Sequence, residues 1–287
     1  MKRTTIFALI FVVFCVSAHS IGNVGHNKKH SDKNNTSTPH TDGIIPKAVT
    51  DIDGNTYNAV RLGNQIWMAE NLRTTKYADG EQIKEGTVVS MNEAYYYYPN
   101  GNSSNMSGYG LLYNVKAVVR DIAAAVHNPN RVQGICPNGW HVPSIAEWAQ
   151  LTEYVSSQKK YTCGDSATYI AKALASTIGW NSSTDICCLE KCFVGDEISS
   201  NNATGFGAMP AGIATRPLES PVGYSDFGNF AYFWSSSFTM DKSLAYDYRL
   251  SYEEAHVLRY WDKQNNSYLY SYWDFRCNGH SVRCVKD

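Results

Sequence analysis

The sequence CPNGWHVPSIAEW, residues 136–148, places the start of a helix shortly after a tight turn. Proline presets a φ angle suited to turns, and asparagine and glycine tolerate positive φ, so the chain reverses direction just after Cys136. Ser144 and Glu147 then form the S-x-x-E pattern of a capping box, in which each side chain accepts a hydrogen bond from the other residue's backbone N–H. The stretch therefore predicts a helix that begins near Ile145.

Apolar residues recur along this helix at steps of three and four positions, which is the spacing of one buried stripe. They are Ile145, Trp148, Leu151 and Val155. Two more helices are expected in the first half of the chain, over residues 115–126 and 166–178, with Asp165 as the N-cap of the latter. From Gly205 onward short apolar runs alternate with Gly, Pro, Ser and Asn, which predicts antiparallel strands joined by long loops. Helices in the first half and strands in the second indicate an α+β domain.

The central stretch also resembles the signature of the Fibrobacter succinogenes major paralogous domain, a secreted bacterial module. Other segments match that family in the expected order, namely GNQIWMAENLR (63–73), YGLLYN (109–114), ATGFGAMPAG (203–212), FWSSS (233–237) and SVRCVKD (281–287). The resemblance covers residues 51–287, and several ordered motifs are more specific than any single one. It implies a secreted domain without an assigned reaction. A weaker similarity of GWHVPSIAEW and FWSSS to C-type-lectin-like folds and to formylglycine-generating enzymes implies a single, disulfide-bonded, C-type-lectin-like domain.

Residues 1–20 are typical of a secretory signal peptide. Two basic residues follow the first Met, residues 6–16 form an apolar run, and small residues suit cleavage after Ala18 or Ser20. The run is too short to span a bilayer. Cys15 raises a lipoprotein anchor as the alternative, but bulky residues precede it where lipoprotein processing requires small ones, so ordinary cleavage is favoured.

Residues 21–49 are rich in Asn, Lys, His, Ser, Thr and Asp, and such a composition predicts a flexible polar linker. Residues 50–287 remain, which suits one large domain. The net charge of the whole chain is -1, and loss of Lys2 and Arg3 with the signal peptide lowers Lys+Arg from 25 to 23 against 26 Asp+Glu, which gives -3. No basic stripe is present, so nucleic acid is not an expected partner.

Cysteine usage indicates an oxidising compartment. Of 8 cysteines one, Cys15, leaves with the signal peptide, and the remaining seven are expected to form disulfides in an exported protein. They are Cys136, Cys163, Cys187, Cys188, Cys192, Cys277 and Cys284. We expect a bond between Cys136 and Cys284, which would tie the central turn to the last strand. An odd count leaves at least one thiol free or bridged to another chain.

A second bond is expected between Cys163 and Cys187, because these residues flank the predicted helix at 166–178. Cys188 is the competing partner for Cys163. If Cys188 bonds to Cys192 instead, Cys277 is the odd thiol. The cysteines near position 190 also raise the alternative of a metal site, which is disfavoured because the second pair of ligands for a closed tetrahedral site is missing.

No metal, cofactor or catalytic residue is expected. Residues 51–55, DIDGN, resemble the start of a calcium loop, but Leu62 stands where such a loop needs a bidentate Glu, which favours a turn. His141 is expected to be a hydrogen-bonded turn or core residue and not a base. The motifs GxSxG and GxxxxGK are absent. Cys277 and Cys284 suggest the cysteine pair of formylglycine-generating enzymes, but the resemblance already assigns Cys284 to the family motif.

Aromatic and polar residues alternate along residues 246–275, which predicts a ligand face or, alternatively, two half-buried strands. Asp247, Arg249 and Asp274 are among the interleaved polar residues, and the amides and carboxylates of this stretch are expected to orient a ligand. The residues expected to bind it are Tyr260, Trp261, Asn265, Asn266 and Trp273. The tyrosine run at 95–98 is the alternative location.

The sequence thus predicts an exported, non-catalytic binding or adhesion module at the bacterial cell surface or outside it. Its expected ligand is an extracellular carbohydrate or protein, and the mature chain is expected to have no transmembrane segment. The alternatives are an oxidoreductase of the formylglycine-generating type and a structural subunit of a surface or an appendage.

Overall fold

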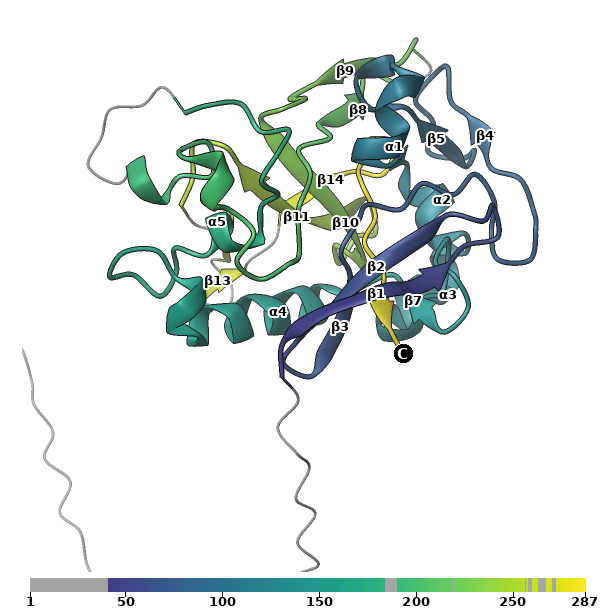
Figure 1. The fold of residues 1–287 in the computed structure, drawn as a ribbon. Helices are drawn as coiled ribbons and strands as arrows, with labels where there is room; N and C mark the ends of the chain where they lie inside the picture. Colours follow the sequence, from purple (N-terminus) through teal and green to yellow (C-terminus); the bar gives the residue numbers. More distant parts are fainter. Residues whose placement is uncertain are drawn as a thin grey trace, which may run out of the picture. The chain divides into compact units, whose positions relative to one another are not determined.

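A five-stranded sheet brings together residues from both ends of the domain (Figure 1). Its strands, in spatial order, are β1 (Gly43–Thr50), β2 (Thr56–Leu62), β3 (Gln65–Met68), β15 (Val285–Lys286) and β7 (Trp140–His141). Each pair of neighbours is antiparallel. The last strand, β15, therefore lies between the N-terminal strands and the central turn.

The computed structural model describes residues 41–183, 190–218, 220–255, 257, 260–262, 267–269 and 272–287. The chain divides into two units, residues 1–38 and residues 39–287, and every described residue belongs to the second. Within the described ranges, no helix has the length and apolar composition required to cross a membrane.

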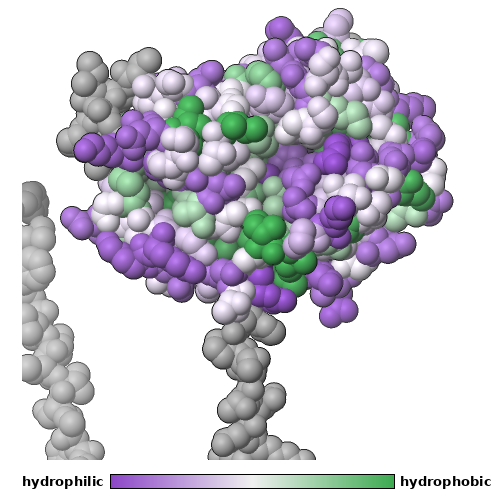
Figure 2. Space-filling model, viewed as in Figure 1, coloured by the Kyte–Doolittle hydropathy of each residue, from purple (hydrophilic) through white to green (hydrophobic). Residues whose placement is uncertain are grey.

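The first strand corrects the predicted linker boundary, because β1 begins at Gly43 and not near residue 50. Ile45 and Val49 are half-buried against the core, and both pair with β2 on either side of a bulge. These apolar residues supply buried surface, which a polar linker composition does not. On the face seen in Figure 2, a hydrophobic patch lies just above the start of β1.

The predicted central helix is present as α4 (Ile145–Ser157), with both hydrogen bonds of the capping box between Ser144 and Glu147. Trp148, Leu151 and Val155 are buried on one face, as their spacing predicts. These residues form a hydrophobic core with β10 (Phe230–Phe238) and β11 (Leu244–Ser251), in which the Trp148 ring stacks on Tyr248 with 4.4 Å between ring centroids.

The other two predicted helices differ from expectation. Residues 115–126 form two short helices, α2 (Val115–Val119) and α3 (Ile122–His127), because Arg120 adopts a φ of 60° and Asp121 caps α3 by accepting from Ala124 N–H. The prediction for 166–178 is wrong, since only α5 (Ala171–Leu174) is helical there. The carbonyls of Ala173 and Leu174 accept hydrogen bonds from residues 204 and 208, so tertiary contacts take the groups that a longer helix would use.

The second half consists mainly of short antiparallel strands joined by long loops, as the sequence predicts. One sheet contains β10 (Phe230–Phe238), β11 (Leu244–Ser251) and β14 (Tyr272–Phe275), and two hairpins contain β8 (Ile213–Thr215) with β9 (Gly223–Ser225) and β12 (Tyr260–Asp262) with β13 (Ser267–Leu269). The first half of the chain contributes one more sheet, in which β5 (Tyr95–Tyr97) is the central strand. It pairs in parallel with β4 (Lys84–Glu85) and antiparallel with β6 (Leu112–Tyr113). A single-turn helix, α1 (Met106–Tyr109), precedes β6. The fold class is α+β.

Two disulfides link described residues. The predicted bond between Cys136 and Cys284 is present, with 6.0 Å between the Cα atoms. The predicted bond between Cys163 and Cys187 is wrong, because Cys163 is bonded to Cys192. Cys192 lies in a 3-10 turn, and it packs in one hydrophobic cluster with Cys163, Tyr169 and Ala255. This packing places the Cys192 thiol within bonding distance of Cys163. Cys187 and Cys188 lie outside the described residues, and Cys277 is a buried free thiol.

Arg283 holds the terminal segment in the core through an unusual set of contacts. Its side chain is fully buried, and it donates hydrogen bonds to the carbonyls of Met68, Phe206 and Gly207 and to the side chain of Asn71. Burial lowers the pKa of its guanidinium from the ordinary value. The satisfied donors allow a cation in the core, because a buried charge is tolerated only when it is fully hydrogen-bonded.

Candidate functional site

The residues that the sequence predicts as ligand-binding do not lie together in one sheet. Tyr260 and Trp261 belong to β12, whereas Trp273 belongs to β14, where it pairs with Tyr246 of β11. Asn265 and Asn266 lie outside the described residues, as do the side chains of Tyr260, Trp261 and Trp273. Figure 1 shows β13 far from the β8–β9 hairpin. The predicted segment therefore extends over separate parts of the molecule.

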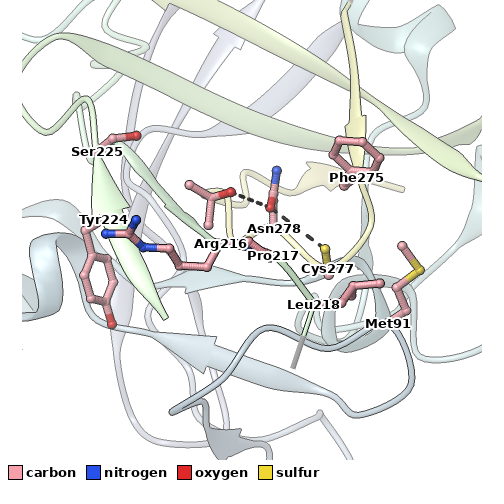
Figure 3. Close-up of a pocket in the computed structure, with 10 residues that line it drawn as sticks. Met91, Arg216, Pro217, Leu218, Tyr224, Ser225, Phe275, Cys277 and Asn278 are labelled. Carbon is pink, nitrogen blue, oxygen red and sulfur yellow. Dashed lines mark hydrogen bonds between the residues drawn. The ribbon is translucent and has the colours of Figure 1, made fainter. Parts of the chain in front are cut away.

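A cavity of about 570 Å³ lies where the last residue of that segment, Phe275, meets the β8–β9 hairpin. Its described walls come from the loop before β5, the β8–β9 hairpin with its connecting loop, and the turn after β14. The lining residues are Met91, Thr215, Arg216, Pro217, Leu218, Tyr224, Ser225, Phe275, Cys277 and Asn278. Figure 3 shows Met91, Leu218 and Phe275 on one side of Cys277, and Arg216 and Tyr224 on the other.

The cavity has an exposed apolar rim and a buried, neutral floor. Leu218 and Phe275 are 49% and 57% exposed, which is high for such large apolar side chains. Cys277 is 4% exposed, and burial raises the pKa of its thiol, so the thiol stays protonated. A neutral floor beneath apolar walls favours an apolar group in the cavity.

Hydrogen bonds fix the floor before any ligand binds. Asn278 Oδ1 accepts from Thr215 Oγ1 at 2.9 Å, and Asn278 Nδ2 donates to Asp274 Oδ1 at 2.8 Å. The backbone N–H of Phe275 donates to the same Asp274 oxygen at 2.7 Å. Asp274 therefore orients both the floor and the rim of the cavity.

Asp274 belongs in turn to a buried ion cluster that also contains Asp247, Arg249 and His280. Arg249 lies 2.9 Å from Asp247 Oδ2 and 3.4 Å from Asp274 Oδ2, and each ring nitrogen of His280 lies 3.3 Å from one of these carboxylates. Burial raises the pKa of Asp247 against the opposing effects of His280 and Arg249. Burial also acts to raise the pKa of Asp274, but His280, Arg249 and the Phe275 N–H together outweigh it and the pKa falls.

The cluster corrects our expectation for the carboxylate of Asp247, which is not available to orient a ligand. Asp247 is fully buried, so its carboxylate faces Arg249 and His280 and not solvent. Ligand atoms of Asp247, Asp274 and His280 lie within 4.8 Å of one another, a spacing that a metal ion could use. Arg249 and His280 each contact both carboxylates, so the arrangement fits an ion-pair network better than a metal site.

His141 lines a second, more polar cavity of about 590 Å³. Its Nε2 lies 2.7 Å from Glu147 Oε1 and its Nδ1 lies 2.6 Å from Asp287 Oδ1. Burial alone would lower the pKa of His141, but the two carboxylates outweigh it and raise the pKa. With both ring nitrogens bonded, His141 is hydrogen-bonded as the sequence predicts, but it is a buried residue of β7 and not a turn residue, and its side chain contacts Asp287.

The two cysteines that suggested an oxidoreductase are not a pair of thiols. Cys284 is bonded to Cys136, whereas Cys277 is free and its thiol lies 4.0 Å from Asn278 Oδ1. The structure therefore does not form the Cys277–Cys284 thiol pair on which that alternative depended.

Comparison with known proteins places the chain in one family. The model of the Fibrobacter succinogenes major domain matches residues 60–286, which includes the cavity beside Phe275, the ion cluster and both described disulfides. Neither a search of curated proteins nor a search of solved structures gave a match. Because the family model matches most of the chain, this protein belongs to the Fibrobacter succinogenes major domain family.

Proposed function

We propose that the chain is an exported, non-catalytic binding or adhesion module that acts at the bacterial cell surface or outside it. The observation that carries this proposal is the open cavity beside Phe275, with its apolar rim and its preformed floor. Concave apolar sites with a few fixed polar groups are typical of ligand binding. The ligand classes remain protein and carbohydrate.

The cavity offers binding surface but not the features of a nucleophilic site. A cysteine nucleophile needs a lowered pKa and a neighbouring base, whereas burial raises the pKa of Cys277 and its thiol lies beside the Asn278 amide. Exposed Leu218 and Phe275 would instead gain by burial against a ligand, at about 25 cal/mol for each Å² of apolar surface removed from water.

Export is supported by the signal-peptide pattern of residues 1–20 and by the two disulfides, which persist in oxidising compartments. N-terminal sequencing of the mature protein tests this part of the proposal. Cleavage after Ala18 or Ser20 is expected. A lipid-modified Cys15 at the mature N-terminus would instead indicate a membrane anchor. The finer assignment of the α+β fold as C-type-lectin-like rests on the two motif resemblances.

A screen of glycan and protein arrays with the mature chain tests the binding function. We expect at least one ligand whose binding is weakened by Phe275→Ala and unchanged by Met240→Ala. Met240 is the matched control because it is apolar, 93% exposed and outside the cavity lining. Absence of any ligand, together with self-assembly of the chain in solution, would count against this proposal and favour a structural subunit.

A further inference from the structure

We infer that the cavity beside Phe275 binds a segment of a protein ligand in which a large apolar side chain lies next to a carboxylate. This inference rests on the proposed binding function and specifies the ligand chemistry of the same site. It is based on three observations. The walls of the cavity are apolar, the polar groups on its floor are already hydrogen-bonded within the protein, and Arg216 lies at its edge.

The polar groups on the cavity floor are already used by the protein. Thr215 donates to Asn278, and the Asn278 amide group donates to Asp274. A sugar would place several hydroxyl groups in the cavity, and each hydroxyl that is buried without a partner costs free energy. An aromatic or branched aliphatic side chain has no such requirement and matches the walls formed by Met91 and Leu218.

Arg216 supplies the only charge among the described residues that line the cavity. Within the described part of the chain it forms no ion pair, whereas the guanidinium groups of Arg73, Arg120 and Arg249 each contact at least one carboxylate. Arginine binds a carboxylate through two parallel N–H donors. An acidic group of the ligand at the cavity mouth would therefore form an ion pair with Arg216.

The backbone of Gly223 lets the Arg216 side chain lie across β9. A Cβ atom added at Gly223 would come within 2.1 Å of Arg216 Nε and 2.8 Å of Arg216 Nη2. Figure 3 shows the guanidinium reaching toward the Tyr224 side of the cavity. Gly223→Ala would therefore displace the cation without removing it.

Two fluorescent probes with the same ring system separate the apolar and the anionic contributions. The dye 1-anilinonaphthalene-8-sulfonate carries a sulfonate, and N-phenyl-1-naphthylamine is its neutral counterpart. Phe275→Ala and Leu218→Ser should weaken binding of both dyes. Arg216→Gln and Gly223→Ala should weaken binding of the sulfonate dye by roughly three-fold, as expected for a partly exposed ion pair, and leave the neutral dye unchanged.

Titrations of dye fluorescence on the mature chain give these affinities, thermal unfolding shows that each variant is folded, and Met240→Ala is the control. If Phe275→Ala weakens both dyes but Arg216→Gln affects neither, the ligand class is wrong while the binding function stands. An array glycan whose binding depends on Phe275 would likewise overturn the ligand class. If folded Phe275→Ala and Leu218→Ser variants bind both dyes like the wild type, the cavity is not a ligand site and both proposals fail.

Discussion

Removal of the Cys136–Cys284 disulfide should destabilise the domain more than removal of the Cys163–Cys192 disulfide. A disulfide restricts the unfolded chain, and in the chain-entropy model the effect grows with the logarithm of the number of residues in the closed loop. The two bonds have sequence separations of 148 and 29 residues. The model gives about 5 kcal/mol for the larger loop and about 3.6 kcal/mol for the smaller one.

The expected difference between the two double variants is therefore about 1.4 kcal/mol, which a denaturant titration resolves. Urea unfolding of Cys136→Ala/Cys284→Ala and Cys163→Ala/Cys192→Ala should give midpoints in that order, lowest for the first. The position of β15 between β3 and β7 adds to the effect, because Cys284 directly precedes β15. A larger loss for the Cys163 variant, or equal losses, would show that loop closure does not control the stability of this domain.

Three further predictions concern His141, Arg283 and the predicted ligand face. Because the pKa of His141 is raised, its ion pairs contribute fully below its ordinary value of 6.5, and the contribution is lost as pH rises through the raised value. Asp287→Asn should therefore reduce the free energy of unfolding more at about pH 6 than at about pH 9, by up to about 1 kcal/mol, and an equal loss at both values would refute the charged pair. Arg283→Met should destabilise by about 3 kcal/mol or more in urea unfolding, since several buried carbonyls lose their donor, and a neutral result would contradict this account. Trp261→Ala should leave unchanged the binding of an array ligand that depends on Phe275, because Trp261 belongs to the β12–β13 hairpin and not to the described lining of the cavity. A loss of about 2 kcal/mol or more in a folded variant would instead make Trp261 an anchor and move the site to that hairpin.

Apart from the Cys136–Cys284 disulfide, the parts of the fold that the sequence predicted correctly are those encoded by nearby residues. The capping box of Ser144 and Glu147 and the apolar stripe of α4 both lie within residues 144–157, and both are present in the structure. The helix predicted at 166–178 failed because hydrogen bonds from residues 204 and 208 outweigh its local helical preference. Such contacts between distant segments leave no periodic pattern in the sequence.

The same limit applies to the candidate site. Its lining residues come from three separate stretches, near position 91, at 215–225 and at 275–278, so no local motif marks the cavity. Phe275 was included in the predicted aromatic segment, but its partners Leu218 and Arg216 were not. The odd cysteine was the one available signal, because the alternative pairing of Cys188 with Cys192 left Cys277 free, and Cys277 does form part of the floor.

Because of the buried ion cluster, ligand binding in the cavity should be tested by substitutions at its exposed edge and not at Asp274. Removing one member of a buried ion pair leaves an uncompensated charge and costs about 3–5 kcal/mol, so a substitution at Asp274 would disturb Arg249 and His280 as well as Asn278. A loss of binding in such a variant would not separate a damaged fold from a damaged site. Phe275, Leu218 and Arg216 are exposed, and Phe275 contacts the cluster through its backbone N–H, which a side-chain substitution keeps. Substitutions at these residues therefore change the surface that a ligand contacts and leave the side-chain hydrogen bonds of the cavity floor intact.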